Sequence, residues 1–530
     1  MHIRSICKHI NKGRLGDYMS KGKSQIKSGV VLSYLNLLIG NIIPFFYTPL
    51  MLSILGQDEY GIYSLSNTVV GYLSLLSFGM GSAVVRYLTK YKALGDYEKE
   101  RKMFGLFTFL YSVLAAVVLI LGCILAANIH IIYGNTLSSS ELATMRTLVV
   151  LCSINSALSF VFATYSSIVL VYEKYIFRQI LNIFSTILAP VSNIIVLLLG
   201  FASVGMVLVS TFINVAMFVT NLIYCSKVIK IRPEFRGMPF GELKSIFGFC
   251  FFTFLGSIVD MLFWATDKAI IGAAIGAAAV AVYNVGSTFN SIVTSISTTI
   301  SGVLTPKITT MVVKDASKKE LTDLFVKVGR LQYILVALVV SGFTVFGRQF
   351  ICIWVGDSYS EAYTVALLTL IPVTVPLIQN TGLSIVIAQN KHRFRSMVYL
   401  IIAIVNALTT AFVVNYWGII GAAACSAGSY VIGQGIIMNW YYWKKTGINI
   451  PLFWKNIIKM SLAPAVMITA GIIICQFVVI DSWLSLFIGI AVYLVCYIPI
   501  VWFTGMNEYE KDTVLSPIKK IKGKFIKNKE

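Results

Sequence analysis

The sequence predicts an all-α integral membrane protein of about 14 transmembrane helices, with two six-helix lobes related by a pseudo-repeat and two extra C-terminal helices. Three observations lead to this fold class. Of 530 residues, 57% are hydrophobic and only 12% are charged, about half the charged share of a soluble globular chain. The apolar residues are grouped in runs of about 20, the length that crosses a bilayer. The basic residues are grouped between alternate runs.

Each predicted span is an apolar run long enough to cross the hydrocarbon core. The spans are expected near 29–54, 61–84, 103–127, 143–171, 180–200, 204–226, 246–269, 279–303, 331–355, 364–388, 397–415, 418–440, 457–480 and 483–504. The resulting regions are a cytoplasmic basic tail at 1–28, an N-lobe of spans 1–6 at 29–226, a cytoplasmic linker at 227–245, a C-lobe of spans 7–12 at 246–440, spans 13 and 14 at 441–504, and a second basic tail at 505–530.

The positions of the basic residues predict how the chain is oriented. Of 43 Lys and Arg residues, 40 lie in the two tails and in alternate loops between the spans. Basic loops remain on the cytoplasmic side, so we expect a multi-pass protein of the cytoplasmic (cell) membrane with both termini in the cytoplasm. This distribution accounts for the net charge of +21 without nucleic acid, and it favours contact with anionic membrane lipids.

The seventh apolar run contains charged side chains in sequence apolar enough to lie in lipid. Thr253, Gly256, Asp260, Trp264 and Asp267 follow one another by three or four residues, which predicts one polar stripe on one helix. An ionised side chain near the bilayer centre costs about 2.5–3.5 kcal/mol on insertion scales. We therefore expect the stripe to face a protein interior or a wet cavity.

This stripe has a counterpart 220 residues earlier in the chain. The equivalent positions of the first span are also small or polar, namely Ser33, Asn36, Gly40, Pro44 and Tyr47. The same offset relates Gly56 to Gly276 and Tyr63 to Tyr283. A constant offset through two spans and a loop indicates a duplicated six-span unit, as in transporters built from structural repeats.

Three basic residues lie outside the cytoplasmic segments, namely Arg146, Lys268 and Arg348. They are candidate substrate-binding residues, because cations form strong hydrogen bonds with phosphate groups. Asn36 and Trp264, which lie on the two polar stripes, are the other candidates. For Arg146 and Arg348 the alternative is snorkelling to headgroups at the outer interface.

Asp260 and Asp267 are the candidate ion-coupling residues, since a carboxylate near the middle of a membrane can exchange a proton or Na⁺. The alternative for Asp260 is a structural hydrogen bond to a neighbouring span, and for Asp267 it is a salt bridge with Lys268. No cofactor and no metal site is expected, and either H⁺ or Na⁺ could drive transport.

Other polar residues within spans have simpler interpretations. Asparagines in spans 4 to 6, such as Asn155, Asn214 and Asn221, are more often interhelical hydrogen-bond partners than ligands. Span 10 contains Pro372 and Pro376, and proline removes a backbone donor from a helix. We therefore expect span 10 to be a broken helix.

Three stretches resemble a known family: LGQDEYGIYSL at 55–65, SFGMGSAVVRYLTKYKALGD at 77–96 and TDKAIIGAAIGAAAVAVYNVGSTF at 266–289. They are similar to bacterial polysaccharide flippases, which export oligosaccharide repeat units and are related to multidrug antiporters and lipid II flippases. The resemblance implies alternating access for a polyprenyl-diphosphate-linked oligosaccharide used for lipopolysaccharide, capsule or exopolysaccharide. It also implies a cationic cavity and a polysaccharide polymerase machinery as partner. This sequence differs from the family by having few cations within its spans.

Two other functions remain open. One is a cation-coupled drug or metabolite antiporter of the same superfamily, which a cavity rich in carboxylates would favour. The other is a membrane polysaccharide polymerase or ligase, which needs an external domain to act on the sugar. The outer loops are short, and the sequence contains no Walker, GxSxG, HExxH or CxxC motif, so we do not expect an enzyme.

Overall fold

The computed structural model describes residues 3–389, 391–512 and 515, and these residues form helices joined by turns and short loops, with no strand among them. Contacts divide the chain into two compact units, Met1–Ala281 (unit 1) and Val282–Glu530 (unit 2). The all-helical fold is confirmed. Its cause is physical, because a helix satisfies its backbone hydrogen bonds internally, where lipid offers no partner.

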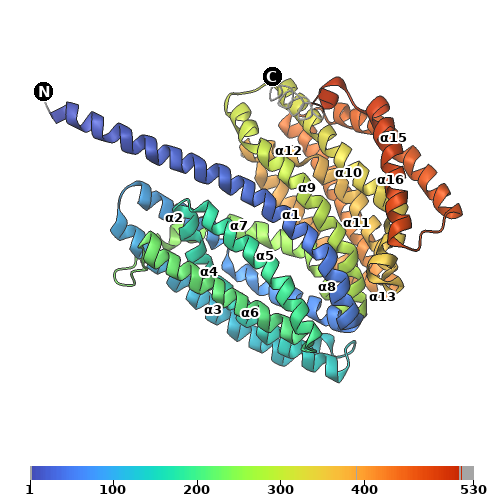
Figure 1. The fold of residues 1–530 in the computed structure, drawn as a ribbon, viewed down its shortest axis with the longest axis horizontal. Coiled ribbons are helices and arrows are strands. Elements are labelled where there is room, and N and C mark those ends of the chain that lie inside the picture. The colour runs from blue at the N-terminus through green and yellow to red at the C-terminus, as the bar shows by residue number, and fades with distance from the viewer. Residues whose placement is uncertain (1–2, 390, 513–514, 516–530) are drawn as a thin grey trace, which may run out of the picture. The chain divides into compact units, whose positions relative to one another are not determined.

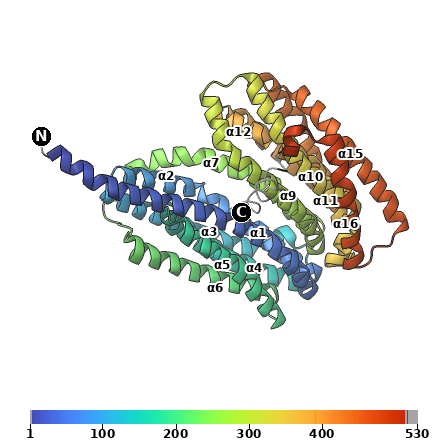
Figure 2. The same cartoon turned by 45° about the horizontal axis from the view of Figure 1, so that its top comes forward.

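Unit 1 is built from long helices with short connections (Figure 1). Its elements are α1 Ile3–Leu73, η1 Ser74–Ser77, α2 Met80–Ala93, α3 Tyr97–Tyr133, α4 Ser139–Val171, α5 Tyr175–Leu198, α6 Ala202–Ile223, η2 Tyr224–Ile229, η3 Phe240–Glu242, α7 Leu243–Trp264 and α8 Thr266–Ala274. Helices α3 and α4 run side by side in both views (Figures 1 and 2), and α4 also packs against α1 and α6. Phe104, Phe107 and Tyr111 of α3 are fully buried in this packing.

The predicted repeat is visible in the backbone. Gly56 interrupts α1 with a φ of 75°, and Gly276, 220 residues later, separates α8 from α9 (Ala277–Val313) with a φ of 126°. Both values lie in the region that only glycine adopts readily. A second pair, Gly95 and Asp315, has the same offset and φ values of 72° and 52°. The pseudo-repeat is therefore confirmed by turns of matching position.

The beginning of α9 packs closely on α1 within unit 1. A Cβ atom added to Gly61 would lie 1.9 Å from the carbonyl oxygen of Ala277, so only glycine fits at residue 61. Nearby, the Thr136 hydroxyl donates to the Gly272 carbonyl at 2.9 Å. These contacts fix the turn around Gly276 against α1 and against the connection between α3 and α4.

The segment between α6 and α7 is attached to the ends of α2 and α3. The Glu234 backbone N–H donates to the Arg101 carbonyl at 3.1 Å, and the two side chains form an ion pair at 3.5 Å. The Tyr91 hydroxyl of α2 donates to the Glu242 carboxylate, and the Tyr87 hydroxyl pairs with Ser245 at 2.7 Å. The predicted linker is thus part of unit 1 and not a free tether.

Unit 2 contains most of α9 and the helices that follow it. These elements are α10 Lys318–Val355, η4 Asp357–Tyr359, α11 Glu361–Ile378, α12 Asn380–Ala388, α13 His392–Tyr430, η5 Val431–Met438, α14 Asn439–Tyr441, η6 Tyr442–Thr446, α15 Ile450–Phe477, α16 Trp483–Ile500 and η7 Val501–Gly505. Its core includes the fully buried Phe325 and Phe453, whose ring centroids are 4.7 Å apart. The extra C-terminal helices α15 and α16 pack on α10 around Phe346, Met467 and Tyr493.

Predicted span 10 is a broken helix in the structure. Helix α11 ends at Ile378 and α12 begins at Asn380, and between them Gln379 has a φ of −105° and a ψ of 8°. Pro376 cannot donate a backbone hydrogen bond, which frees a carbonyl one turn earlier and weakens the helix at this point. The expected break is confirmed.

Eleven helices among the described residues are long and apolar enough to cross a membrane. One of them, Leu35–Ala93, contains two predicted spans on either side of Gly56, and another, Arg393–Thr446, contains two on either side of Gly418. The chain is therefore a multi-pass membrane protein. The count of fourteen crossings and the lobe boundaries at 227–245 and 441–504 remain predictions. Helices α7 and α8, which the sequence predicts to open the C-lobe, belong to compact unit 1.

Candidate functional site

The predicted polar stripe of the seventh span is divided between two helices. Helix α7 ends at Trp264 and α8 begins at Thr266, with Ala265 between them. Asp260 is exposed on α7, whereas Asp267 is buried in the first turn of α8 beside the half-buried Lys268. The expectation that the stripe lies on one uninterrupted helix is wrong, because Ala265 separates the two helices with a φ of −117°.

The start of α8 is held by α1. The Thr266 hydroxyl at the start of α8 pairs with the Tyr72 hydroxyl at 2.9 Å. This contact orients the first turn of α8, where Asp267 favours the helix because carboxylates stabilise helix N-termini. The side chain of Trp264 lies outside the part of the chain that the structure describes.

The other predicted site residues lie in separate neighbourhoods. Arg146 is exposed on α4 and its Nε donates to the Ala126 carbonyl of α3 at 3.2 Å. Asn36 is half-buried on α1, where its side-chain oxygen accepts a hydrogen bond from Thr186 of α5 at 3.2 Å. Arg348 is exposed on α10 in unit 2. Their roles in binding remain predictions.

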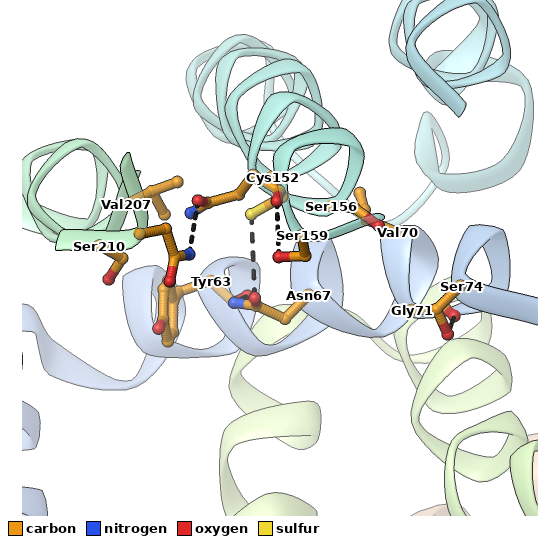
Figure 3. A pocket seen from close by; sticks show the side chains of 12 residues that line it. Tyr63, Asn67, Val70, Gly71, Ser74, Cys152, Ser156, Ser159, Val207 and Ser210 are labelled. Carbon is orange, nitrogen blue, oxygen red and sulfur yellow. Dashed lines mark hydrogen bonds between the residues drawn. The ribbon is translucent and has the colours of Figure 1, made fainter. Parts of the chain in front are cut away.

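Unit 1 contains a polar pocket with a volume of about 250 Å³ that the sequence did not single out (Figure 3). Three helices line it, α1 beyond its kink at Gly56, α4 and α6. The α1 residues are Tyr63, Asn67, Val70 and Gly71, and Ser74 follows at the start of η1; those of α4 are Cys152, Asn155, Ser156 and Ser159; those of α6 are Val207, Ser210 and Asn214. On each helix these residues are spaced so that they share a face. Asn67, Ser74 and Ser159 are exposed, so the pocket is open.

Hydrogen bonds link the three helices across the pocket. Asn214 of α6 donates through Nδ2 to the Asn155 side-chain oxygen of α4 at 2.8 Å. The Cys152 thiol of α4 lies 3.8 Å from the Asn67 side-chain oxygen of α1. The expectation that Asn155 and Asn214 are interhelical partners is confirmed, and the two asparagines hold α4 and α6 at a fixed separation.

Several lining hydroxyl groups form hydrogen bonds with their own helix. Ser159 donates to the Asn155 carbonyl at 2.9 Å, Ser210 to the Met206 carbonyl at 2.9 Å and Ser74 to the Gly71 carbonyl at 2.6 Å. A hydroxyl that donates in this way keeps its lone pairs available to a ligand. These three hydroxyl groups therefore present acceptors to the pocket while their own donors are satisfied.

The twelve lining residues include no Asp, Glu, Lys, Arg or His. Within the described part of the chain, no group of three or more His, Cys, Asp and Glu residues is placed to hold a metal ion. The lining can bind a neutral polar group through hydrogen bonds. The sequence did contain a signal for this pocket, since polar residues recur at helical spacing within three apolar spans.

Comparisons with known proteins agree with this architecture. A family model described as polysaccharide biosynthesis protein matches residues 50–364. The uncharacterized membrane protein EpsK of Bacillus subtilis (strain 168) is 23% identical over 489 residues, which are 90% of this chain and 94% of that protein.

Solved structures share the fold at low sequence identity. The lipid II flippase MurJ, in an inward closed conformation, aligns with a TM-score of 0.74 at 15% identity, covering 92% of this chain and all of the other. A mutant of the MATE transporter VcmN of Vibrio cholerae aligns with a TM-score of 0.56 at 14% identity, covering 81% of this chain and 99% of the other. The resemblance inferred from the sequence is confirmed. Because the family model matches more than half of its length, the chain belongs to the polysaccharide biosynthesis protein family, with a fold shared by membrane flippases and transporters.

Proposed function

We propose that the protein is a flippase that moves a polyprenyl-diphosphate-linked oligosaccharide from the inner to the outer leaflet of the cytoplasmic membrane. Membership of the family supports a role in polysaccharide biosynthesis, and a fold in common with a lipid II flippase supports a lipid-linked cargo. The two repeat-related lobes would open alternately to the two sides of the membrane. The exported units would then pass to a polysaccharide polymerase machinery.

The observation that carries this proposal is the uncharged polar pocket of unit 1. Its helices α1, α4 and α6 belong to stretches apolar enough to cross a membrane, so polar residues there need a partner or a function. Asn155 and Asn214 partly satisfy each other, yet the pocket remains open and rich in hydroxyl groups. Such a lining suits a sugar, which offers hydroxyl groups as donors and acceptors.

A cation-coupled antiporter is the second candidate. A cationic drug held away from water needs a carboxylate to balance its charge, and the lining of this pocket has none. Asp260 and Asp267 lie outside the pocket, on α7 and α8. We therefore assign them to ion coupling in a flippase, with Arg146, Lys268 and Arg348 as candidates for attracting the diphosphate.

The orientation that we propose places both termini in the cytoplasm. The supporting observation is the concentration of basic residues in the tails and alternate loops, as the positive-inside rule requires. Reporter fusions after Lys529 and in the segment Ser138–Glu141, at the start of α4, should report opposite compartments. Identical compartments would contradict this topology.

The experiment that tests the proposed function is depletion of the protein in its own cells. Lipid-linked oligosaccharides should accumulate in the inner leaflet, where membrane-impermeant lectins or glycosidases cannot reach them in intact cells. Re-expression of the chain should reduce the accumulated pool. Unchanged lipid-linked sugars, combined with greater sensitivity to cationic drugs, would favour the antiporter instead.

A further inference from the structure

We infer that the pocket of unit 1 is a subsite for one uncharged sugar ring of the cargo and that it discriminates against sugars bearing a carboxylate or a phosphate. The inference rests on the proposed function and adds which part of the cargo binds here. Three properties of the pocket support it: its unused hydrogen-bonding capacity, its lack of charge and its size.

The asparagine pair offers both donors and an acceptor to a ligand. Asn155 uses its side-chain oxygen to accept from Asn214 at 2.8 Å, and its own amide NH₂ donates to no other described residue. The side-chain oxygen of Asn214 likewise accepts no hydrogen bond within the described chain. A side-chain amide has two donor hydrogens and two acceptor lone pairs, so most of this capacity remains for a bound group.

Hydroxyl groups complete this lining. The Ser156 side chain has no hydrogen bond to any described residue, and it is half-buried on the α4 face that also bears Cys152 and Ser159. Ser159 and Ser210 donate to their own helices, so their oxygens can accept. Figure 3 shows Ser156 and Ser159 on α4 facing the segment of α1 that bears Asn67.

This mixture of groups fits a sugar better than an ion. Each sugar hydroxyl both donates and accepts, and it can therefore pair with an amide NH₂ and a serine oxygen together. A phosphate or carboxylate offers acceptors only, and its burial is costly without a cation to balance it. The twelve lining residues include no cation, so the diphosphate of the cargo belongs outside this pocket.

The size of the pocket limits how much of the cargo it can hold. Its volume is about 250 Å³, slightly below the roughly 300–1,000 Å³ of pockets for drug-sized ligands. One sugar ring with its hydroxyl groups fits such a volume, whereas an oligosaccharide does not. The subsite would therefore read one residue of the repeat unit while the rest lies elsewhere.

Binding of simple glycosides to the purified full-length protein tests this inference without requiring transport. Methyl β-glucopyranoside is the neutral probe, and methyl β-glucuronide is its acidic match, differing only in the carboxylate. Affinities are measured by ligand-observed NMR titration of protein in lipid nanodiscs. We expect the glucoside to bind at least about tenfold more tightly, because the glucuronide would bury an unpaired charge.

Variants locate the binding in the pocket. Asn155→Ala and Asn214→Ala should each weaken glucoside binding about three- to tenfold, the effect of one lost hydrogen bond. Ser156→Ala removes a hydroxyl that bonds to no described residue, so it should weaken binding without disturbing the helices. The matched control is Asn221→Ala on the same helix α6, since among the described residues Asn221 donates only to the Met217 carbonyl one turn earlier.

The outcomes separate this inference from the proposed function. Three results would overturn the subsite, even if the protein moves lipid-linked oligosaccharide. They are no binding of either glycoside, equal binding of glucoside and glucuronide, and unchanged glucoside affinity in Ser156→Ala and Asn214→Ala. Glucoside binding that the pocket variants weaken would support the subsite. If the same protein does not move lipid-linked oligosaccharide, that result would count against the flippase function and not against the subsite.

Discussion

Arg330 and Glu510 form a buried bidentate ion pair between α10 and the segment that follows α16. Arg330 Nε donates to Glu510 Oε1 at 2.5 Å, and Arg330 Nη2 donates to Glu510 Oε2 at 2.9 Å. The same guanidinium donates to the Gly505 carbonyl at 2.9 Å. Arg330 is 6% exposed and Glu510 is fully buried, so water cannot replace either partner. The pair fastens the segment after η7 to α10 within unit 2.

Replacing Glu510 with Gln should lower the free energy of unfolding by about 3–5 kcal/mol, because it leaves the Arg330 charge buried without a counterion. Thermal unfolding of the purified protein measures the change. The control is Glu98→Gln, which removes a surface pair with Lys102 and should leave the unfolding temperature unchanged. Equal effects of the two substitutions would show that the buried pair does not stabilise unit 2.

Replacing Gly61 with Ala should destabilise unit 1 by at least about 1–3 kcal/mol, the usual cost of overpacking. The new methyl group would lie 1.9 Å from the Ala277 carbonyl oxygen, which forces α1 and the beginning of α9 apart. The control is Gly248→Ala on α7, where an added Cβ meets no atom within 4 Å. Protease resistance in membranes compares the two, and a stable Gly61→Ala protein would contradict the close packing.

Replacing Arg146, Lys268 and Arg348 one at a time with Gln should reduce export without reducing the amount of protein. A charge-assisted hydrogen bond to phosphate contributes about 1.5–3 kcal/mol, so each true contact corresponds to a loss of roughly tenfold or more. Surface labelling of exported polysaccharide, normalised to protein level, provides the measurement. If all three variants export normally, other groups must hold the diphosphate.

Replacing Asp260 with Asn should abolish the dependence of transport on an imposed ion gradient. Asn keeps the shape of the side chain and much of its hydrogen bonding, but it cannot ionise. Transport into vesicles is measured with H⁺ and Na⁺ gradients applied separately, with Asp267→Asn as the comparison on α8. Gradient-dependent transport that survives in Asp260→Asn would remove this residue from the coupling mechanism.

Much of the fold could be predicted from the sequence because local rules determine it. Apolar runs in lipid must be helical, and the offset of 220 residues correctly pairs Gly56 with Gly276. The broken tenth span could also be predicted, since Pro376 weakens its helix irrespective of neighbours. In each case the cause lies in the segment itself.

The features that depend on distant partners could not be predicted in this way. The interruption at Ala265 lies next to a hydrogen bond between Thr266 and Tyr72, which are 194 residues apart. The sequence places Arg330 among the basic residues of the cytoplasmic loops. In the structure it is buried against Glu510, which is 180 residues away. Polar spacing was present on all three pocket helices, but the packing of α1, α4 and α6 decides that these faces meet.

The most direct test of the central claim uses vesicles that contain the purified protein and a lipid-diphosphate oligosaccharide with a fluorescent sugar in the inner leaflet. A membrane-impermeant quencher added outside reports how much cargo has reached the outer leaflet. The account predicts rapid quenching with the wild-type protein, slower quenching with Asn214→Ala and wild-type rates with Asn221→Ala. The flippase function would be contradicted if quenching were no faster than in protein-free vesicles at any lumenal or external ion concentration.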